Sequence, residues 1–312
     1  MKNSSGGYYI GIDSGGTKCE ILIASKDKKV IFNKLYKGVH YSVSGVEAYS
    51  EIVTDFIDNS LSNCSLGLKH CIAICFGIAG AREKKDRKKL KNAFVQRLRV
   101  KNILITTDAM TALYGAFEGN DGIILISGTG SVLYGHSSGI ITRVGGWGRI
   151  IGDEGSGYWI GKRALNLITK EYDETNSKNK KSLLSQKVEN EFGINRVNIN
   201  EKVFQEDLEI QNIAPVVIEC AKTNCFLGKK IVNEAVEELV NHVKSYLRIS
   251  KRKKNIKIAF IGSIIENKNI LSDKLKNEIK KLKIVEVIPK KHSSAFGAVL
   301  LASENPEITR KL

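Results

Sequence analysis

The sequence predicts an α/β protein built from two domains. Its 312 residues exceed the roughly 250 residues at which a single hydrophobic core usually stops growing. Apolar runs of strand length alternate with amphipathic helical stretches in both halves. A strand that leads into a glycine-rich hairpin occurs near residues 8–18 and again near 122–131, and such a repetition indicates an internal duplication.

The pattern of apolar residues places the elements. In the first half it predicts strands at 8–12, 20–24, 30–33, 71–78 and 103–107 and helices at 46–61, 83–98 and 108–117. In the second half it predicts strands at 123–126, 132–135, 140–144, 256–261 and 284–287, a long helical region up to about residue 250, and helices near 269–281 and from 294. We therefore expect a domain boundary near residues 119–122, with a helical insertion in the second domain.

Composition favours a soluble protein of the cytoplasm. No apolar stretch approaches the ~20 residues that a membrane span needs, and residues 1–7 are polar, so we expect neither an anchor nor a signal peptide. The six cysteines contain no C-x-x-C pair, which is typical of reduced thiols in a reducing compartment.

The net charge of +16 raises the possibility of a nucleic-acid partner. However, the basic clusters at 84–91, 178–181 and 251–254 lie far apart, and no interleaved aromatic residues or zinc-ligand spacing accompany them. We expect solvated lysine-rich faces and no nucleic-acid partner.

The first hairpin has the composition of a phosphate-binding loop. Gly15, Gly16, Thr17 and Lys18 offer backbone N–H groups, a hydroxyl and an ammonium group. The order Thr17 then Lys18 reverses that of a Walker A loop, and a strand follows instead of a helix. A plain turn is the alternative, but the second glycine hairpin, at Gly128, Thr129 and Gly130, favours a pair of loops that bind a triphosphate.

Two aspartates have positions suited to catalysis. Asp13 lies beside the first hairpin and could hold magnesium through water, or could simply cap the turn. Asp108 follows a strand and opens a helix, a place where α/β sheets bind ligands. It could be the general base for phosphoryl transfer to a hydroxyl or the N-cap of the helix.

Residues 145–157 form a second unusual segment, with six glycines, one tryptophan and two adjacent carboxylates. Such a loop is typical of a ligand wall, in which Trp147 could pack on a sugar and Asp153 could accept bonds from its hydroxyls. The alternatives are core packing for Trp147 and helix capping for Asp153. Gly262 and Ser263, after a strand, are a further place where a nucleotide could approach the backbone.

Together these segments resemble the N-acetylglucosamine kinase group of the BadF/BadG/BcrA/BcrD ATPase family, part of the superfamily of actin and hexokinase. The resemblance is carried by residues 11–24, 105–116, 125–135, 145–161, 259–264 and 292–302. It implies two actin-like ATPase (ribonuclease H-like) domains with a central cleft, at residues 1–120 and 121–292, and a final helix at 293–312 that returns to the first domain.

The resemblance also implies roles. Asp108 matches the catalytic aspartate, Asp13 and Thr17 belong to the first phosphate motif, and Gly128 to Gly130 belong to the second. Thr129, Gly146, Trp147 and Asp153 match positions near the amino sugar, and Gly262 with Ser263 matches the adenosine motif. His40 stands where relatives carry a sugar-contacting asparagine.

We therefore expect a kinase that uses ATP and magnesium to phosphorylate N-acetylglucosamine at the 6-hydroxyl, with N-acetylmuramic acid as a further substrate from cell wall recycling. Glucosamine is an alternative, because His40 leaves recognition of the sugar's 2- or 3-substituent open. By analogy with this family we also expect a homodimer.

Three other functions are disfavoured. An ATPase activator of a dehydratase would need cysteines for an iron–sulfur cluster, but Cys71 and Cys75 lie in a predicted strand. A sugar sensor would need a DNA-binding segment ahead of the first strand. A zinc-containing sugar kinase would need a Cys/His cluster with ligand spacing.

Overall fold

The computed structural model describes residues 7–174, 181–206, 208–223, 225–250 and 255–304. The chain forms two compact units: one runs up to Asp121 and resumes at Pro289, and the other is Gly122–Ile288. Residues 178–180 and 251–254 of the basic clusters, 1–6 of the polar start and 305–312 of the expected final segment lie outside the described residues.

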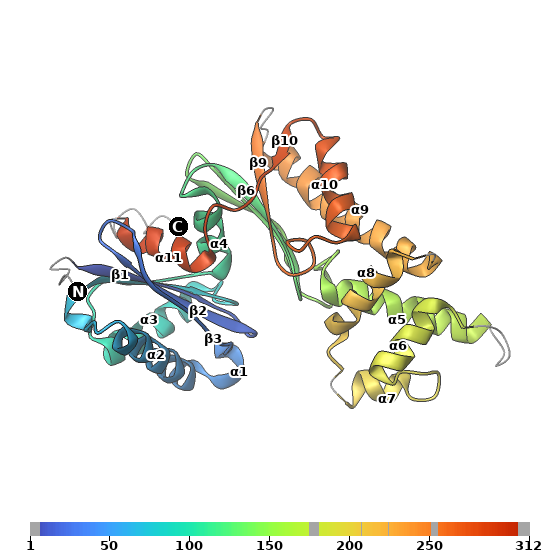
Figure 1. The fold of residues 1–312 in the computed structure, drawn as a ribbon, viewed down its shortest axis with the longest axis horizontal. Helices are drawn as coiled ribbons and strands as arrows, with labels where there is room; N and C mark the ends of the chain where they lie inside the picture. Colours follow the sequence, from blue (N-terminus) through green and yellow to red (C-terminus); the bar gives the residue numbers. More distant parts are fainter. Residues whose placement is uncertain (1–6, 175–180, 207, 224, 251–254, 305–312) are drawn as a thin grey trace. The chain divides into compact units, whose positions relative to one another are not determined.

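The first unit is built on a five-stranded mixed sheet (Figure 1). In spatial order its strands are β3 (Val30–Lys37), β2 (Lys18–Ser25), β1 (Tyr8–Ser14), β4 (Cys71–Ile78) and β5 (Ile103–Thr106). The first three form an antiparallel meander, whereas β4 and β5 run parallel to β1. The carboxyl ends of β1, β4 and β5 therefore meet at one edge of the sheet.

Alternation along β1 sends its side chains to two different layers. Ile10 and Ile12 face a core shared with Tyr49 of α2 (Val46–Asn63) and Phe94 of α3 (Lys84–Leu98). The other face is covered by α11 (Ser294–Ser303), which also packs on α4 (Asp108–Phe117) (Figure 1). Two short helices, α1 (Tyr41–Ser44) and η1 (Leu68–His70), complete the unit.

Small residues allow α11 to lie close to β1 and α4. A Cβ atom on Gly11 would overlap the carbonyl of Ala295 and the side chain of Val299. A Cβ atom on Gly297 would overlap backbone atoms of Thr111 and Gly115 in α4. The last described helix is thereby fixed against the two elements that carry Asp13 and Asp108.

The second unit repeats the topology of the first. Its sheet has the order β10 (Val285–Val287), β9 (Ile256–Ile261), β6 (Gly122–Ser127), β7 (Ser131–Ser137) and β8 (Ile140–Gly145). Here too a three-stranded meander is followed by two strands parallel to its first strand.

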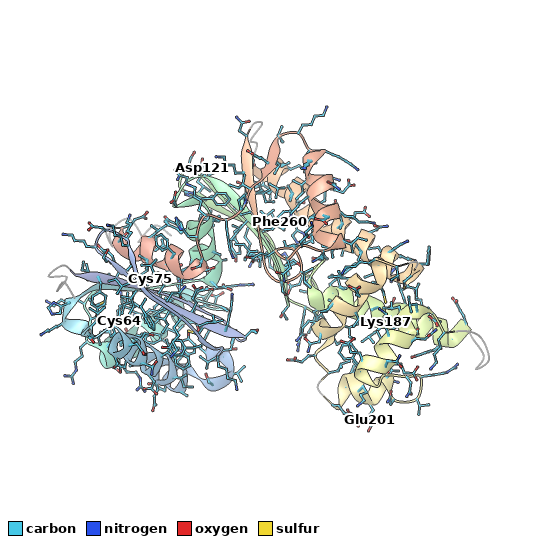
Figure 2. All side chains as sticks on the ribbon, viewed as in Figure 1. Cys64, Cys75, Asp121, Lys187, Glu201 and Phe260 are labelled. Atoms are coloured by element: carbon cyan, nitrogen blue, oxygen red, sulfur yellow. The ribbon has the colours of Figure 1, made fainter. Side chains whose placement is uncertain are left out.

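Helices form most of the rest of the second unit. Between β8 and β9 lie α5 (Gly157–Glu174), α6 (Leu183–Phe192), α7 (Ile199–Phe204), η2 (Ile210–Ile213), α8 (Ala214–Ala221) and α9 (Phe226–Ser250), and α10 (Ile270–Lys280) follows β9. A bidentate ion pair of 2.7 and 3.0 Å joins Arg163 of α5 to Glu234 of α9. Figure 2 shows Phe260 on β9, with Lys187 and Glu201 on the helices α6 and α7.

The structure confirms the predicted α/β class, with two mixed sheets and a helical insertion between β8 and β9. Strand β3 differs most from its predicted bounds: it continues to Lys37 because Lys37 still pairs with Lys18 of β2, although polar residues occupy this edge strand. The six cysteines carry free thiols, and Figure 2 shows Cys64 and Cys75 on different elements. No helix in the described ranges is long and apolar enough to cross a membrane.

The contact between α11 and β1 can be tested with Gly11→Ala. The added methyl group meets backbone atoms that cannot rotate away, so we expect a loss of about 2 to 4 kcal/mol in the free energy of unfolding, measured by urea titration. Gly67→Ala is the matched control, because no atom lies within 4 Å of a Cβ at Gly67. Equal stabilities for the two variants would contradict the proposed close packing.

Candidate active site

The β1–β2 hairpin forms a tight, partly open turn. The N–H of Gly15 donates to the carbonyl of Lys18 at 2.9 Å, so this N–H closes the turn and is not available to a phosphate. Gly16, Thr17 and Lys18 are exposed. The N–H of Gly38 donates to the carbonyl of Thr17 at 3.2 Å, which brings the segment that carries His40 against the hairpin.

Asp13 and Asp108 lie at the same edge of the first sheet. The N-cap of α4 is Thr107, whose hydroxyl accepts from the N–H of Met110, so Asp108 is the first residue of the helix and not its cap. Thr111 connects the two aspartates: its hydroxyl donates to the Asp108 carbonyl at 2.8 Å and lies 3.5 Å from the Asp13 carboxylate. The helix therefore fixes Asp108 in place, with its carboxylate near the backbone N–H of Ala109.

Burial makes both carboxylates more basic than usual. It raises the pKa of Asp13 to about 7, helped by the neighbouring charge of Asp108 and opposed by Lys18. Burial also raises the pKa of Asp108, and this effect is opposed by the backbone N–H of Ala109 and by the positive charge of Arg82. Both side chains are only partly open to solvent, and a carboxylate in such a place favours a proton or a bound cation.

His40 lies in the first unit, between the β1–β2 hairpin and the loop after β4. Its ring is in contact range of Gly16 and of Gly80 in the loop after β4, and it stacks on Tyr41 with centroids 5.6 Å apart. Its Nδ1 pairs with the backbone and hydroxyl of Ser42, at 3.3 and 2.7 Å. The structure thus brings His40 together with Asp108, and its Nε2 faces Gly80.

In the second unit the corresponding hairpin is tied to its neighbours through its backbone. The N–H of Gly128 donates to the carbonyl of Gly130 at 3.0 Å. The carbonyls of Gly128 and Thr129 accept from Gly157 and Tyr158 at the start of α5, at 2.7 and 3.3 Å. The carbonyls of this hairpin are therefore engaged, and the side chain of Thr129 remains exposed.

The loop of residues 145–157 folds against this hairpin. Asp153 lies beside Gly130, and its carboxylate also accepts from the N–H of Gly148 at 3.0 Å. Trp147 is 67% exposed, which excludes core packing, and the Arg143 guanidinium lies 4.6 Å from its ring centroid. Gly146 is buried beside it. Ser156 accepts from the N–H of Trp159 at the start of α5, so Asp153 is not needed as a helix cap.

Gly262 and Ser263 reach the same hairpin from β9. Gly262 has φ +98°, and a Cβ atom there would overlap the carbonyl of Ser127. The N–H of Ile264 donates to that carbonyl at 3.1 Å. Only glycine tolerates both this backbone conformation and this contact. The Ser263 side chain is exposed next to it.

Each unit thus gathers its own predicted residues. The first brings together Asp13, residues 15–18, His40 and Asp108, and the second brings together residues 128–130, Gly146, Trp147, Asp153, Gly262 and Ser263. Sequence reasoning missed Arg82, whose charge acts on Asp108. The sequence signal that could have found Arg82 is its place just after the carboxyl end of β4, the strand next to the one that precedes Asp108.

Two five-stranded sheets of the same topology, each with a glycine hairpin after its first strand, define the actin-like ATPase fold of sugar kinases. The chain belongs to the BadF/BadG/BcrA/BcrD ATPase family, whose model matches residues 10–302. The family resemblance seen in the sequence is confirmed.

The relatives found by sequence are named as sugar kinases. The N-acetylmuramic acid/N-acetylglucosamine kinase of Clostridium acetobutylicum is 32% identical over 95% of this chain and 98% of its own. The N-acetyl-D-glucosamine kinase of Dictyostelium discoideum is 27% identical over 94% and 97%. A solved structure from Chromobacterium violaceum, provisionally assigned as an N-acetylglucosamine kinase, has a TM-score of 0.75 at 23% identity, covering 94% and 98%.

The raised pKa of Asp13 predicts that this residue destabilises the fold. Its neutral form is favoured in the folded state, so the penalty is absent below pH 4, grows as the pH rises and is complete above about pH 7. Asp13→Asn removes the charge, and we expect the free energy of unfolding at pH 8 to rise by about 2 kcal/mol, less than the full shift implies because the side chain is partly open to solvent.

The measurement is urea unfolding at pH 8 and pH 4 without magnesium. The gain should vanish at pH 4. Asp27→Asn, in an exposed turn, is the control and should change stability little at either pH. A less stable Asp13→Asn protein at pH 8 would show that the Asp13 carboxylate is already paired in the native state.

Proposed function

We propose that this protein transfers the γ-phosphoryl group of ATP to the 6-hydroxyl of an N-acetylated amino sugar, N-acetylglucosamine or N-acetylmuramic acid. The observation that carries the proposal is Asp108, a partly buried carboxylate held by the first turn of α4 at the carboxyl edge of the first sheet. The kinase relatives over almost the whole chain support the same reaction.

Asp108 acts as the general base. Burial raises the pKa of its carboxyl group, which makes it a better proton acceptor than an ordinary aspartate. It takes the proton of the 6-hydroxyl as that oxygen attacks phosphorus. Because phosphoryl transfer has a loose transition state, the fixed position of Asp108 on α4 contributes as much as its basicity.

Asp13 fits a magnesium site that the nucleotide completes. Among the described residues no group of three or more His, Cys, Asp or Glu side chains could hold a metal by itself. Magnesium typically uses one or two carboxylates, several waters and substrate phosphates. Burial raises the pKa of Asp13, so a bound cation would stabilise its ionised form. Bound magnesium would neutralise phosphate charge. Thr17 and Lys18 contact the phosphates from the same hairpin.

The second unit binds the nucleotide through neutral groups. Residues 128–130 contact the phosphates, and Gly262 with Ser263 contacts adenosine, where the side chain of Ser263 is exposed. Thr129, Gly146 and Asp153 contact the sugar hydroxyls, as His40 does in the first unit. Trp147 packs on the sugar with its exposed ring.

Buried thiols argue against the dehydratase-activator alternative. Cys75 is buried in the core of the first unit, and its burial raises the pKa of the thiol. A cluster ligand must be an accessible thiolate. The free thiols also suit a reducing cytoplasm, where we place the protein. Glucosamine is the substrate alternative, and homodimer formation remains a prediction.

The first test measures ADP release from ATP and magnesium with N-acetylglucosamine, N-acetylmuramic acid, glucosamine and glucose. We expect turnover that depends on an acetylated amino sugar and stops when EDTA removes magnesium. Asp108→Asn should lower kcat by about 100- to 10,000-fold, because the general base is lost. Asp55→Asn, on the exposed face of α2, is the control. ATP hydrolysis that ignores every sugar would contradict the proposal.

Trp147→Ala tests the sugar wall. Its ring is exposed, so stability should stay within about 0.5 kcal/mol of the wild type. We expect kcat/KM for the sugar to fall by roughly 10-fold, chiefly through a higher KM. Phe204→Ala removes another exposed aromatic ring from the same unit and should leave kcat/KM unchanged. An unchanged KM in the Trp147 variant would exclude the contact.

A further inference from the structure

A pocket of about 310 Å³ lies in the first unit, away from Asp13 and Asp108. Its lining comes from the beginnings of β4 and β5, from α3 on one face of the sheet and from the end of α11 on the other. Because β4 and β5 run parallel, their amino ends meet at the edge of the sheet opposite the one that carries the two aspartates. The pocket is therefore separate from the carboxylates of the proposed reaction.

Two lysine side chains line this pocket from different elements. Lys91 comes from α3, and Lys101 comes from the bend that leads into β5. Neither ammonium group has an ion pair or a hydrogen bond with any residue that the structure describes. Residues 84–101 include nine basic residues and one acidic residue, so the potential around the pocket is positive. The pocket thus presents two available positive charges to a ligand.

Strand β5 adds a backbone donor. It is the last strand of its sheet, so one of its sides has no neighbouring strand in the described part of the chain. The carbonyl of Asn102 accepts from the N–H of Ile74 in β4 at 2.9 Å. Successive residues of a strand direct their backbone groups to opposite sides, so the N–H of Ile103 points to the open side. Ile103 lines the pocket, and its N–H can donate to a ligand oxygen.

One carboxylate also lines the pocket, but it has a partner elsewhere. Oε1 of Glu304 would lie 3.5 Å from a Cβ atom on Gly119, and the carboxylate interacts with the Tyr114 hydroxyl of α4. The remaining walls are mostly apolar, and they come from Ala73, Ile74, Leu104, Leu301 and Ala302. The pocket therefore suits a small ligand that has an anionic group and a body with an apolar face.

We propose that this pocket binds a small phosphate monoester, whose phosphate group lies between Lys91 and Lys101 and accepts a hydrogen bond from the N–H of Ile103. An ammonium group binds phosphate as a compact point charge, whereas a carboxylate is matched better by the planar fork of an arginine. Two ammonium groups balance the roughly two negative charges that a phosphate monoester carries at neutral pH. The volume is at the low end of small-molecule sites, which span about 300 to 1,000 Å³, and it suits a sugar phosphate.

The proposed reaction itself yields such a compound, because phosphorylation of an amino sugar at its 6-hydroxyl gives a phosphate monoester. Only the choice of this product as the first ligand to test rests on the proposed function. The pocket and its two lysines are independent of it.

The first test measures binding of N-acetylglucosamine 6-phosphate by calorimetric titration of the full chain. The candidate active site is saturated beforehand with a non-hydrolysable ATP analogue, magnesium and N-acetylglucosamine, and we expect one further site. Lys91→Met and Lys101→Met should each weaken binding at this site by about 10- to 100-fold, the usual range for a lost charge-assisted hydrogen bond. Lys89→Met removes an exposed positive charge from α3 outside the pocket lining and should leave the affinity unchanged. Equal affinities in all four proteins would overturn the proposal.

A second readout is local to the pocket. Acetylation of single lysines by a reactive ester, followed by mass spectrometry, measures how far each probe protects Lys91 and Lys101. N-acetylglucosamine 6-phosphate should protect both lysines, inorganic phosphate should protect them more weakly, and N-acetylglucosamine or acetate should not protect them. Protection by acetate as strong as that by the ester, or no protection by the ester, would overturn the proposal. Failure of sugar-dependent ADP release would instead overturn the kinase function and leave this binding result standing.

Discussion

The close packing of α11 on β1 and α4 is the constraint on which the first half of the candidate site depends. Gly11 and Gly297 let backbones approach where any side chain would intrude. Because Asp13 lies two residues beyond Gly11 on β1, and Asp108 opens α4, one contact sets the relative position of both carboxylates. Ser293 strengthens it by capping α11 and donating to Glu20 of β2 at 3.1 Å. A helix from the far end of the sequence thus supports groups near its beginning.

The packing of α11 on β1 and α4 holds Asp13 and Asp108 in positions that lower the stability of the folded state. Burial and mutual repulsion raise the pKa of Asp13, so its ionised form costs stability at neutral pH. A fold accepts such a cost where the strained group has a task, and the cost falls when a cation arrives. The stability cost of ionised Asp13 therefore supports the magnesium role proposed for this residue.

Local sequence patterns predicted much of the fold because they follow local physics. The strand at 71–78 and the helix at 108–117 match β4 and α4, since apolar runs and periodicity decide both. The end of β3 and the short helix α1 were missed, because pairing with β2 and capping by His40 decide them. The engagement of the Gly15 N–H within its own turn arises only after folding, and no linear pattern encodes it.

The duplicated topology divides the chemistry unequally between the two units. In both hairpins a glycine N–H closes the turn, from Gly15 to Lys18 and from Gly128 to Gly130. The residue before the hairpin serine is Asp13 in the first unit and Ile126 in the second. The strand β5 leads into Asp108, whereas β10 leads into Ile288 and Pro289. A triphosphate carries several negative charges, so carboxylates in both units would repel it. In the proposed reaction the base and the metal ligand both come from the first unit, whereas Asp153, the carboxylate of the second unit, is assigned to the sugar.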